Sequence, residues 1–487
     1  MSHEISRRQA LAILGAAAAG IAAKPSRQND SWIYRSTSEI ARAILSRETS
    51  SEEVVRAHLA RIEEVTPKLN AVVELASERA LLEARNADAA LARGDASGAL
   101  HGVPMTIKDS FDTEGVVTTG GTQGRADFVP ERDATVVARL RRAGAILLGK
   151  TNTPELTLSF ETTNLVYGRT SNPYDLTRTP GGSSGGAAAI VAAGGAPFDI
   201  GSDYGGSIRL PAHYCGIAGI KPTAGRVPRT GHIYPFGGYL DAFQQIGPLA
   251  RTVDDLSFLL PLIAGPDGID PGVHPMPLGK PEDVVVGDLR VAFHTDNGIM
   301  APTLATARTI EAAAKALGGV GARVVEARPK GVETSFDLAM QIYFADGGAA
   351  VRRLLSDAGT TEHSLGVMAE SAPASAEELD ALFVRLDGLR SHMLGIFEDH
   401  DVVLCPVNAG PAIPHGTVES ADAVPAFSYT MTYNMTGWPG VVVRGGTSPE
   451  GLPIGVQILA APTREDVALA VARHLETELT GFVPPSL

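Results

Sequence analysis

The sequence contains little cysteine, no recognisable metal-binding motif and no excess of positive charge. Its 487 residues include two cysteines, Cys215 and Cys405, and both lie in apolar surroundings. Such residues are more typical of buried free thiols than of a disulfide framework. No CxxC, HExxH or clustered His/Cys spacing occurs, so we expect no metal and no cofactor. The net charge of −14 provides no electrostatic footprint for nucleic acid or an anionic membrane.

Residues 1–24 have the pattern of an export signal. A twin-arginine pattern at residues 6–11 precedes an apolar stretch over residues 10–23, with small residues suited to cleavage at its end. At about 14 residues, the stretch is short for a transmembrane span. An amphipathic or core helix is the alternative, but paired arginines have little use in a core. We therefore expect a periplasmic or otherwise exported protein without a stable membrane anchor.

Two serines stand in glycine clusters between residues 180 and 209. Ser183 lies in PGGSSGG and Ser207 in GSDYGGSIR. Neighbouring glycines let the backbone bring several N–H groups toward one point, as an oxyanion hole requires. Lys108 ends an apolar run that is typical of a buried strand, and a buried lysine can become neutral and act as a base. These residues form a candidate nucleophile-and-base set.

The order and spacing of these motifs resemble the amidase signature family. A lone GGSSGG is also typical of a flexible linker, but the combined set is specific. The resemblance extends from about residue 35 to the C-terminus, and it implies an α/β fold with a large mixed β-sheet surrounded by α-helices. The matching segments are residues 102–109, 149–152, 172–174, 180–186, 203–209 and 219–223.

The resemblance also implies roles for individual residues. Ser207 is the expected nucleophile of an acyl-enzyme mechanism, and neutral Lys108 is the general base. Ser183, which follows a non-proline cis peptide in the family, is the expected proton bridge between them. The expected oxyanion-hole donors are the backbone N–H groups of Tyr204, Gly205, Gly206 and Ser207.

Three neighbouring residues are expected to support this set. Ser184 competes with Ser183 for the bridging role, but the family spacing selects the first serine and leaves Ser184 a supporting hydrogen bond. Asp203 and Arg209 are expected to form an ion pair that braces the loop. Tyr204 departs from the family pattern, which has an aliphatic or small residue there, and we expect it to narrow or polarise the acyl side of the pocket.

The chain is predicted to form one domain over residues 31–487. Its catalytic core spans about 95–260, and a variable region that defines the substrate pocket spans about 330–425. Hydrophobic periodicity predicts helices over residues 77–91, 133–144, 303–317, 336–351, 376–398 and 464–479. Strands are predicted over residues 69–75, 100–109, 145–148, 289–293, 322–326 and 401–404, and the resemblance places closing strands over 432–443 and 452–459.

Three functions fit these observations. The first is an exported amidase that acts on a small-molecule amide as a monomer or homodimer. The second is the glutaminase subunit of a tRNA-dependent amidotransferase, a cytoplasmic protein with partner subunits, against which the twin-arginine pattern argues. The third is a catalytically silent family member that binds an amide. The sequence carries no motif that identifies the substrate.

Overall fold

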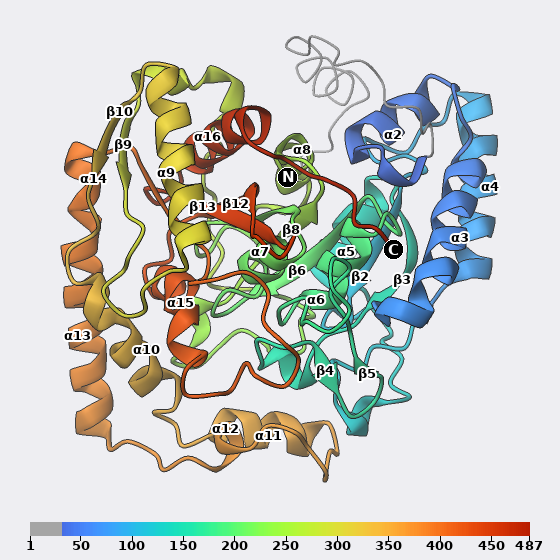
Figure 1. Ribbon diagram of the computed structural model, residues 1–487. Coiled ribbons are helices and arrows are strands. Elements are labelled where there is room, and N and C mark those ends of the chain that lie inside the picture. The colour runs from blue at the N-terminus through green and yellow to red at the C-terminus, as the bar shows by residue number, and fades with distance from the viewer. Residues whose placement is uncertain (1–31) are drawn as a thin grey trace.

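The computed structural model describes residues 32–487, and Figure 1 shows their arrangement. The predicted export signal at residues 1–24 lies outside the described residues. Among the residues described, no helix is both long and apolar enough to cross a membrane.

The centre of the fold is an eight-stranded mixed sheet. Three strands at one edge pair in parallel, and every later pairing is antiparallel. This sheet confirms the predicted architecture. Its strand order is β10 (Arg323–Glu326), β9 (Arg290–Phe293), β11 (Val402–Pro406), β13 (Pro453–Ala460), β12 (Gly440–Thr447), β7 (Ala218–Lys221), β8 (Gln245–Ala250) and β6 (Phe198–Asp203).

The strand that carries Lys108 belongs to a separate three-stranded sheet. Its order is β1 (Val72–Leu75), β3 (Ile146–Thr151) and β2 (Pro104–Lys108). The carboxylate of Asp199 on β6 connects the two sheets, since it accepts the Lys108 N–H at 3.0 Å and the Thr151 hydroxyl at 3.0 Å. The end of β2 is thereby fixed beside the large sheet, which is where the glycine clusters lie.

Helices surround both sheets (Figure 1). Several begin with side-chain caps: Ser36 forms a capping box with Glu39, and Ser50 accepts the Glu53 N–H. The longer helices are α2 (Thr37–Leu45), α3 (Ser51–Leu69), α4 (Ser77–Arg93), α5 (Thr135–Arg142), α6 (Gly185–Ala192), α7 (Arg209–Tyr214), α8 (Val253–Ile263), α9 (Leu304–Gly319), α10 (Ser335–Tyr343), α11 (Ala349–Asp357), α13 (Ala376–Leu394), α15 (Ser428–Met435) and α16 (Glu465–Glu478); α12 (Val367–Glu370) and α14 (Ile396–Asp399) are single turns.

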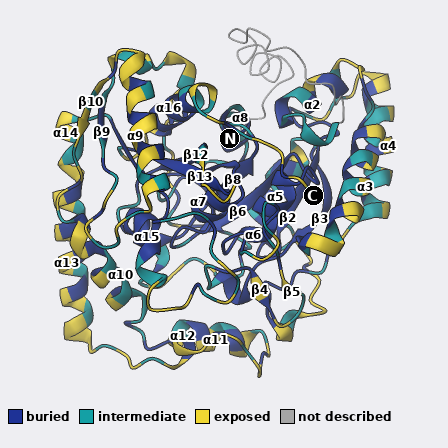
Figure 2. Cartoon of the chain, viewed as in Figure 1, coloured by how far each residue is buried: buried dark blue, intermediate teal, exposed yellow. Residues whose placement is uncertain are grey.

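The interior is darkest in Figure 2 around β6 and α6, while α13 and α14 at the edge carry many exposed residues. Every residue of α6 is buried. Its small side chains allow this close packing: a Cβ at Gly186 would lie 2.6 Å from the Asn152 carbonyl oxygen at the end of β3. The PGGSSGG cluster, which leads into α6, therefore sits against the small sheet.

Three predicted elements differ from the structure. The helix predicted over 376–398 is α13 followed by the short α14. The strand predicted over residues 432–443 is wrong in its first part, because residues 428–435 form α15 and β12 begins only at Gly440. Every residue of α15 is buried, so the helix shows no amphipathic period that would distinguish it from a strand. The single helix predicted over 336–351 is two helices, α10 and α11. Gly347 and Gly348 lie between them with φ of +64° and +76°, values that an α-helix does not allow.

Candidate active site

The Lys108 amine lies among three serine hydroxyls. Its Nζ is 2.7 Å from Ser183 Oγ, 3.0 Å from Ser184 Oγ and 3.0 Å from Ser202 Oγ. The side chain is fully buried. Burial lowers the pKa of Lys108 to about 7, against the opposing charges of Asp199 and Asp203. An amine with a pKa of about 7 is neutral in about half of the molecules at pH 7, and the neutral form can accept a proton from a serine 2.7 Å away.

Ser183 and Ser207 lie on adjoining loops. The Gly182–Ser183 peptide bond is cis, as the family resemblance implies. The Ser184 N–H donates to the Ser207 carbonyl at 3.1 Å, and Thr153 Oγ1 donates to the Ser183 carbonyl at 3.0 Å. The structure thus brings Lys108, Ser183, Ser184 and Ser207 together.

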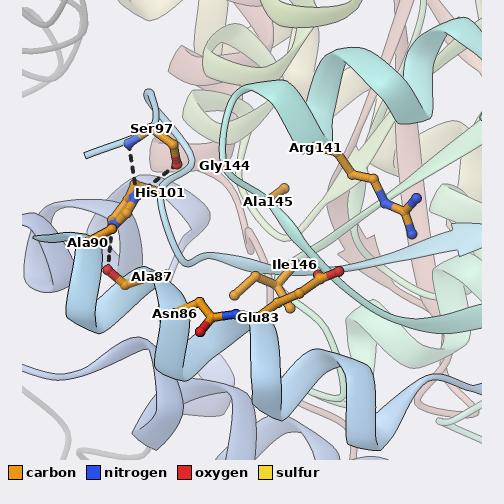
Figure 3. Close-up of a pocket in the computed structure, with 10 residues that line it drawn as sticks. All are labelled: Glu83, Asn86, Ala87, Ala90, Ser97, His101, Arg141, Gly144, Ala145 and Ile146. Carbon is orange, nitrogen blue, oxygen red and sulfur yellow. Dashed lines mark hydrogen bonds between the residues drawn. The ribbon is translucent and has the colours of Figure 1, made fainter. Parts of the chain in front are cut away.

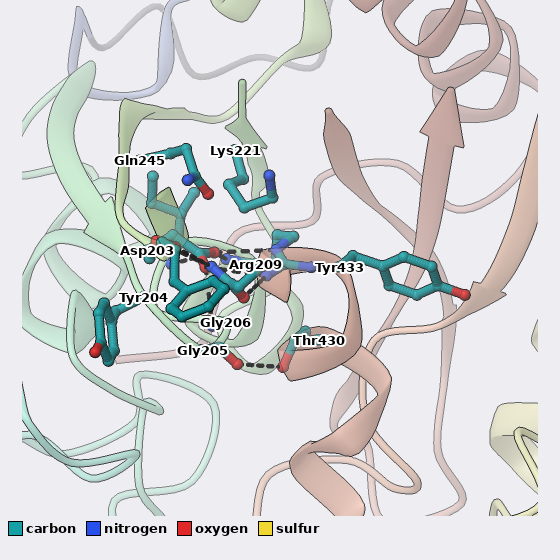
Figure 4. Close-up of polar contacts among 12 residues, drawn as sticks. Asp203, Tyr204, Gly205, Gly206, Arg209, Lys221, Gln245, Thr430 and Tyr433 are labelled. Atoms are coloured by element: carbon teal, nitrogen blue, oxygen red, sulfur yellow. Dashed lines mark hydrogen bonds and ion pairs between the residues drawn. The ribbon is translucent and has the colours of Figure 1, made fainter. Parts of the chain in front are cut away.

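The Ser207 loop joins β6 to α7 and is organised around the Asp203 carboxylate (Figure 4). This carboxylate accepts the N–H groups of Gly206 at 2.8 Å, Ile208 at 3.1 Å and Arg209 at 3.3 Å. From the opposite side, Thr430 Oγ1 donates to the Gly205 carbonyl at 2.8 Å. The loop conformation is therefore fixed at both ends of its glycine pair.

Asp203 and Arg209 form the predicted ion pair, in which Arg209 Nη2 lies 3.0 Å from Asp203 Oδ1. Both side chains are buried, and the guanidinium also donates to Gln457 Oε1 at 2.8 Å and Asn434 Oδ1 at 2.5 Å. Burial alone would raise the pKa of Asp203, but the charge and hydrogen bonds of Arg209 hold it well below its usual range. The carboxylate that holds the loop is therefore ionised at neutral pH.

The oxyanion-hole prediction needs one correction. The Gly206 N–H already donates to Asp203, so it is not available to a substrate oxygen. Within residues 32–487, the N–H groups of Tyr204, Gly205 and Ser207 have no hydrogen-bond acceptor. These three N–H groups are the remaining candidate donors.

Sequence reasoning missed two polar residues of this site. Ser202 directly precedes Asp203 and contacts Lys108, while Asp199 lies earlier on β6 and is fully buried. An ionisable residue between Phe198 and Ile200 was the available signal for Asp199. Ser202 had no such signal, because its contact with Lys108 joins two different sheets.

Aromatic rings flank the nucleophile loop. The Tyr204 ring stacks on Tyr343 of α10 with centroids 5.1 Å apart and lies 5.6 Å from Tyr234. The Tyr343 hydroxyl donates to the Tyr204 carbonyl at 2.9 Å. Near Gly205, Phe160 stacks on Phe427 with centroids 4.1 Å apart. Tyr204 therefore belongs to an aromatic group, and the region predicted to define the substrate contributes Tyr343 to it.

A separate hollow of about 310 Å³ lies between α4 and the start of β3 (Figure 3). It contains none of the predicted catalytic residues. Its His101 links a loop to a helix, with contacts to Ser97 Oγ at 2.8 Å and the Ala87 carbonyl at 3.0 Å. Its Arg141 is paired with Asp133 at 2.9 Å. In the described part of the chain, no group of three His, Cys, Asp or Glu side chains is placed to hold a metal ion.

Comparison with curated proteins gives matches along almost the whole chain. Residues 53–469 match the profile of the amidase family. A glutamyl-tRNA(Gln) amidotransferase subunit of Clostridium acetobutylicum is 33% identical, and the alignment covers 90% of this chain and 98% of that protein. The corresponding subunit of Alkaliphilus metalliredigens is 34% identical, with 91% and 96% covered.

Solved structures agree in fold. A 6-aminohexanoate cyclic dimer hydrolase complexed with substrate has 29% identity and a TM-score of 0.82, and the match covers 93% of this chain and 98% of that one. A vestigial protein complex that reveals the evolutionary origins of an s-triazine catabolic enzyme has 32% identity and a TM-score of 0.83, and the match covers 92% of this chain and 100% of that one. A bacterial aryl acylamidase has 27% identity and a TM-score of 0.79, with 91% and 96% covered. The chain belongs to the amidase signature family, whose enzymes hydrolyse amides.

Proposed function

We propose that this enzyme cleaves a carboxylic amide through an acyl-enzyme on Ser207. The observation that carries the proposal is the 2.7 Å contact between Lys108 Nζ and Ser183 Oγ, at a lysine whose pKa is lowered to about 7 by burial. Ser183 lies on the loop that is hydrogen-bonded to the Ser207 loop. This arrangement supports Lys108 as the base, Ser183 as the bridge and Ser207 as the nucleophile.

In the proposed reaction, Ser207 Oγ forms a bond to the amide carbon and gives its proton to Ser183 Oγ. Ser183 passes its own proton to Lys108 Nζ. Lys108 then returns the proton to Ser183, and Ser183 gives its own proton to the leaving nitrogen as the C–N bond breaks. Water next attacks the resulting ester and gives a proton to Ser183, which again passes its own proton to Lys108; the acid leaves as the ester bond to Ser207 breaks, and Ser207 Oγ takes the proton back through Ser183. The N–H groups of Tyr204, Gly205 and Ser207 would stabilise the oxyanion, and one such donor typically contributes about 2.7–4 kcal/mol to the barrier.

For the substrate, we propose an amide with an apolar or aromatic acyl group. Support comes from the rings of Tyr204, Tyr343 and Phe160, which lie close to the nucleophile loop. Charged groups close to this loop, Asp203 and Arg209, already neutralise each other. An apolar acyl group needs no ionic partner, whereas an amino acid needs two.

The curated relatives favour a second candidate, the glutaminase subunit of an amidotransferase. Two bacterial amidotransferase subunits align over about nine-tenths of this chain. Under this proposal, glutamine is the amide and the released ammonia passes to a partner protein.

One screen separates the two candidates. Purified protein and its Ser207→Ala variant are given short aliphatic amides, aryl anilides, long-chain acyl amides and glutamine, and release of amine or ammonia is measured. Turnover of apolar amides by the wild type alone supports the free-standing amidase. Hydrolysis of glutamine alone, and only after co-expression with the other amidotransferase components of the source organism, supports the second candidate.

We also propose that residues 1–24 direct export through the twin-arginine route. This proposal rests on the paired arginines at positions 7 and 8 and the apolar stretch that follows them. Export is compatible with an amidase that works alone.

A further inference from the structure

His232 is a buried histidine whose ring contacts Ser202, one of the three serines around Lys108. Its loop is held against the residues that follow Lys108: the Ile233 N–H donates to the Ser110 carbonyl at 2.8 Å, and the Asp112 N–H donates to the Gly231 carbonyl at 2.8 Å. His232 is 5% exposed, and its ring packs edge-on against Phe111, with centroids 4.9 Å apart. The ring is therefore fixed in place.

Both ring nitrogens have polar neighbours. Nε2 lies 2.9 Å from Ser202 Oγ. Nδ1 lies 3.1 Å from the Tyr234 carbonyl, 3.1 Å from the Tyr234 N–H and 2.8 Å from the Gln244 side-chain amide. An amide side chain can present either its oxygen or its nitrogen. The surroundings of Nδ1 thus accommodate either neutral tautomer.

The hydrogen bonds around Lys108 select one of the two neutral His232 tautomers during turnover. A protonated Lys108 has three N–H groups, and three serine hydroxyls surround it, so each serine oxygen must accept. Ser184 can accept, because its own hydroxyl donates to the Ser202 carbonyl at 3.3 Å. Within the described chain, the remaining partner for the Ser202 hydroxyl hydrogen is His232 Nε2. Ser202 accepts from Lys108 without losing a hydrogen bond only when Nε2 is an acceptor.

We propose that His232 is a positioning residue for the base. As an acceptor at Nε2, it turns the Ser202 hydroxyl away from Lys108, so that the lone pair of the neutral amine faces Ser183. Nδ1–H then donates to the Tyr234 carbonyl or to the Gln244 amide oxygen. This inference rests on the proposed function, in which Lys108 is the general base.

The charges around His232 favour a neutral ring. Burial lowers the pKa of His232 to about 3, and the charges of Lys108 and Arg229 act in the same direction. Asp199 and Asp203 face the amine and raise the pKa of Lys108. The His232 ring therefore acts through its hydrogen-bond direction at working pH, and Lys108 is the group whose titration is observed.

The test is the pH dependence of kcat/KM for His232→Leu. Without Nε2, the Ser202 hydroxyl donates into the Lys108 lone pair, and the protonated amine loses an acceptor. We expect the plateau of kcat/KM to be about tenfold lower and KM to be unchanged. The rising limb of the pH profile should move to lower pH by about half a unit or more. His232→Gln, whose amide oxygen can accept from Ser202, should keep the limb at its wild-type position.

Two controls distinguish positioning from a structural role. His58→Leu removes another fully buried histidine, on α3, and should leave the limb unmoved. In a Ser202→Ala background, His232→Leu should cause no further displacement, because its effect passes through Ser202. An unmoved limb in His232→Leu, or an equal displacement with and without Ser202, would overturn the inference. Full activity in Lys108→Ala would instead overturn the proposed function.

Discussion

At the scale of single residues, the site depends on a lysine removed from water. Among the described residues, Lys108 has no ionic partner within hydrogen-bond distance, and its amine contacts three hydroxyls instead. Burial makes the charged amine unfavourable, whereas a carboxylate at the same place would keep it charged. The cost of burying the lysine is what makes it a usable base.

The pH dependence of activity follows from this pKa. Only neutral Lys108 accepts a proton, so kcat/KM should rise with pH and reach half its plateau near pH 7, the value to which burial lowers the Lys108 pKa. Initial rates between about pH 5 and 9 measure this limb. Lys108→Ala should lower the plateau by about 10²–10⁴-fold. A flat profile over this range would be inconsistent with a lysine base.

The two adjacent serines should respond differently to alanine. Ser183→Ala breaks the path from Ser207 to Lys108, whereas Ser184→Ala removes one 3.0 Å contact and leaves the path intact. We expect kcat to fall by about 10²-fold or more in Ser183→Ala and clearly less in Ser184→Ala. Steady-state kinetics of the pair measure the difference, and the reverse order would assign the bridge to Ser184.

At the scale of elements, the glycines determine how the loop can be built. Gly206 has φ of +134°, and a Cβ there would collide with Thr430. The Gly206 N–H donates to Asp203, and the Gly205 carbonyl accepts from Thr430. The loop can present its N–H groups only because this position lacks a side chain.

Gly206→Ala should therefore lower both activity and stability. Backbone strain of about 1–3 kcal/mol is expected, together with a fall in kcat of about tenfold or more as the N–H groups move. Thermal unfolding and kinetics measure the two effects. Gly388→Ala is the matched control: this glycine lies on the exposed side of α13 with nothing within 4 Å of a Cβ. It should gain up to about 1 kcal/mol, and equal behaviour of the two variants would contradict the account of the loop.

Sequence patterns predicted the features that depend on residues close together in the chain. Capped amphipathic helices such as α2, and the glycine clusters around Ser183 and Ser207, carry their signals within a few residues. The buried helix α15 has no such signal, because a segment covered on all sides shows no period. The contact between His232 and Ser202 joins residues on different elements, and no pattern in either segment announces it.

At the scale of the whole molecule, two sheets meet at the site. The small sheet supplies Lys108, and the large sheet supplies Ser202 and the start of the Ser207 loop. Asp199 accepts hydrogen bonds from the small sheet while it stands on the large one. The base and the nucleophile are therefore set relative to each other by the packing of the whole fold. The sequence indicated both groups, but not the separation into two sheets.

Export is a property of the full chain and can be tested separately from catalysis. A fusion of residues 1–24 to a reporter that is active only outside the cytoplasm should be exported in a host with the twin-arginine machinery. Replacing Arg7 and Arg8 with lysine should abolish that export. Equal reporter activity with and without the arginines would remove the support for an exported enzyme.

A fluorophosphonate probe followed by peptide mass spectrometry identifies the nucleophile directly. We expect one adduct, on Ser207, formed by the wild type and absent in Ser207→Ala. Labelling of Lys108→Ala should be slower, at the same residue. An adduct on Ser183 or Ser184, or undiminished labelling of Ser207→Ala, would contradict the assignment of Ser207 as the nucleophile.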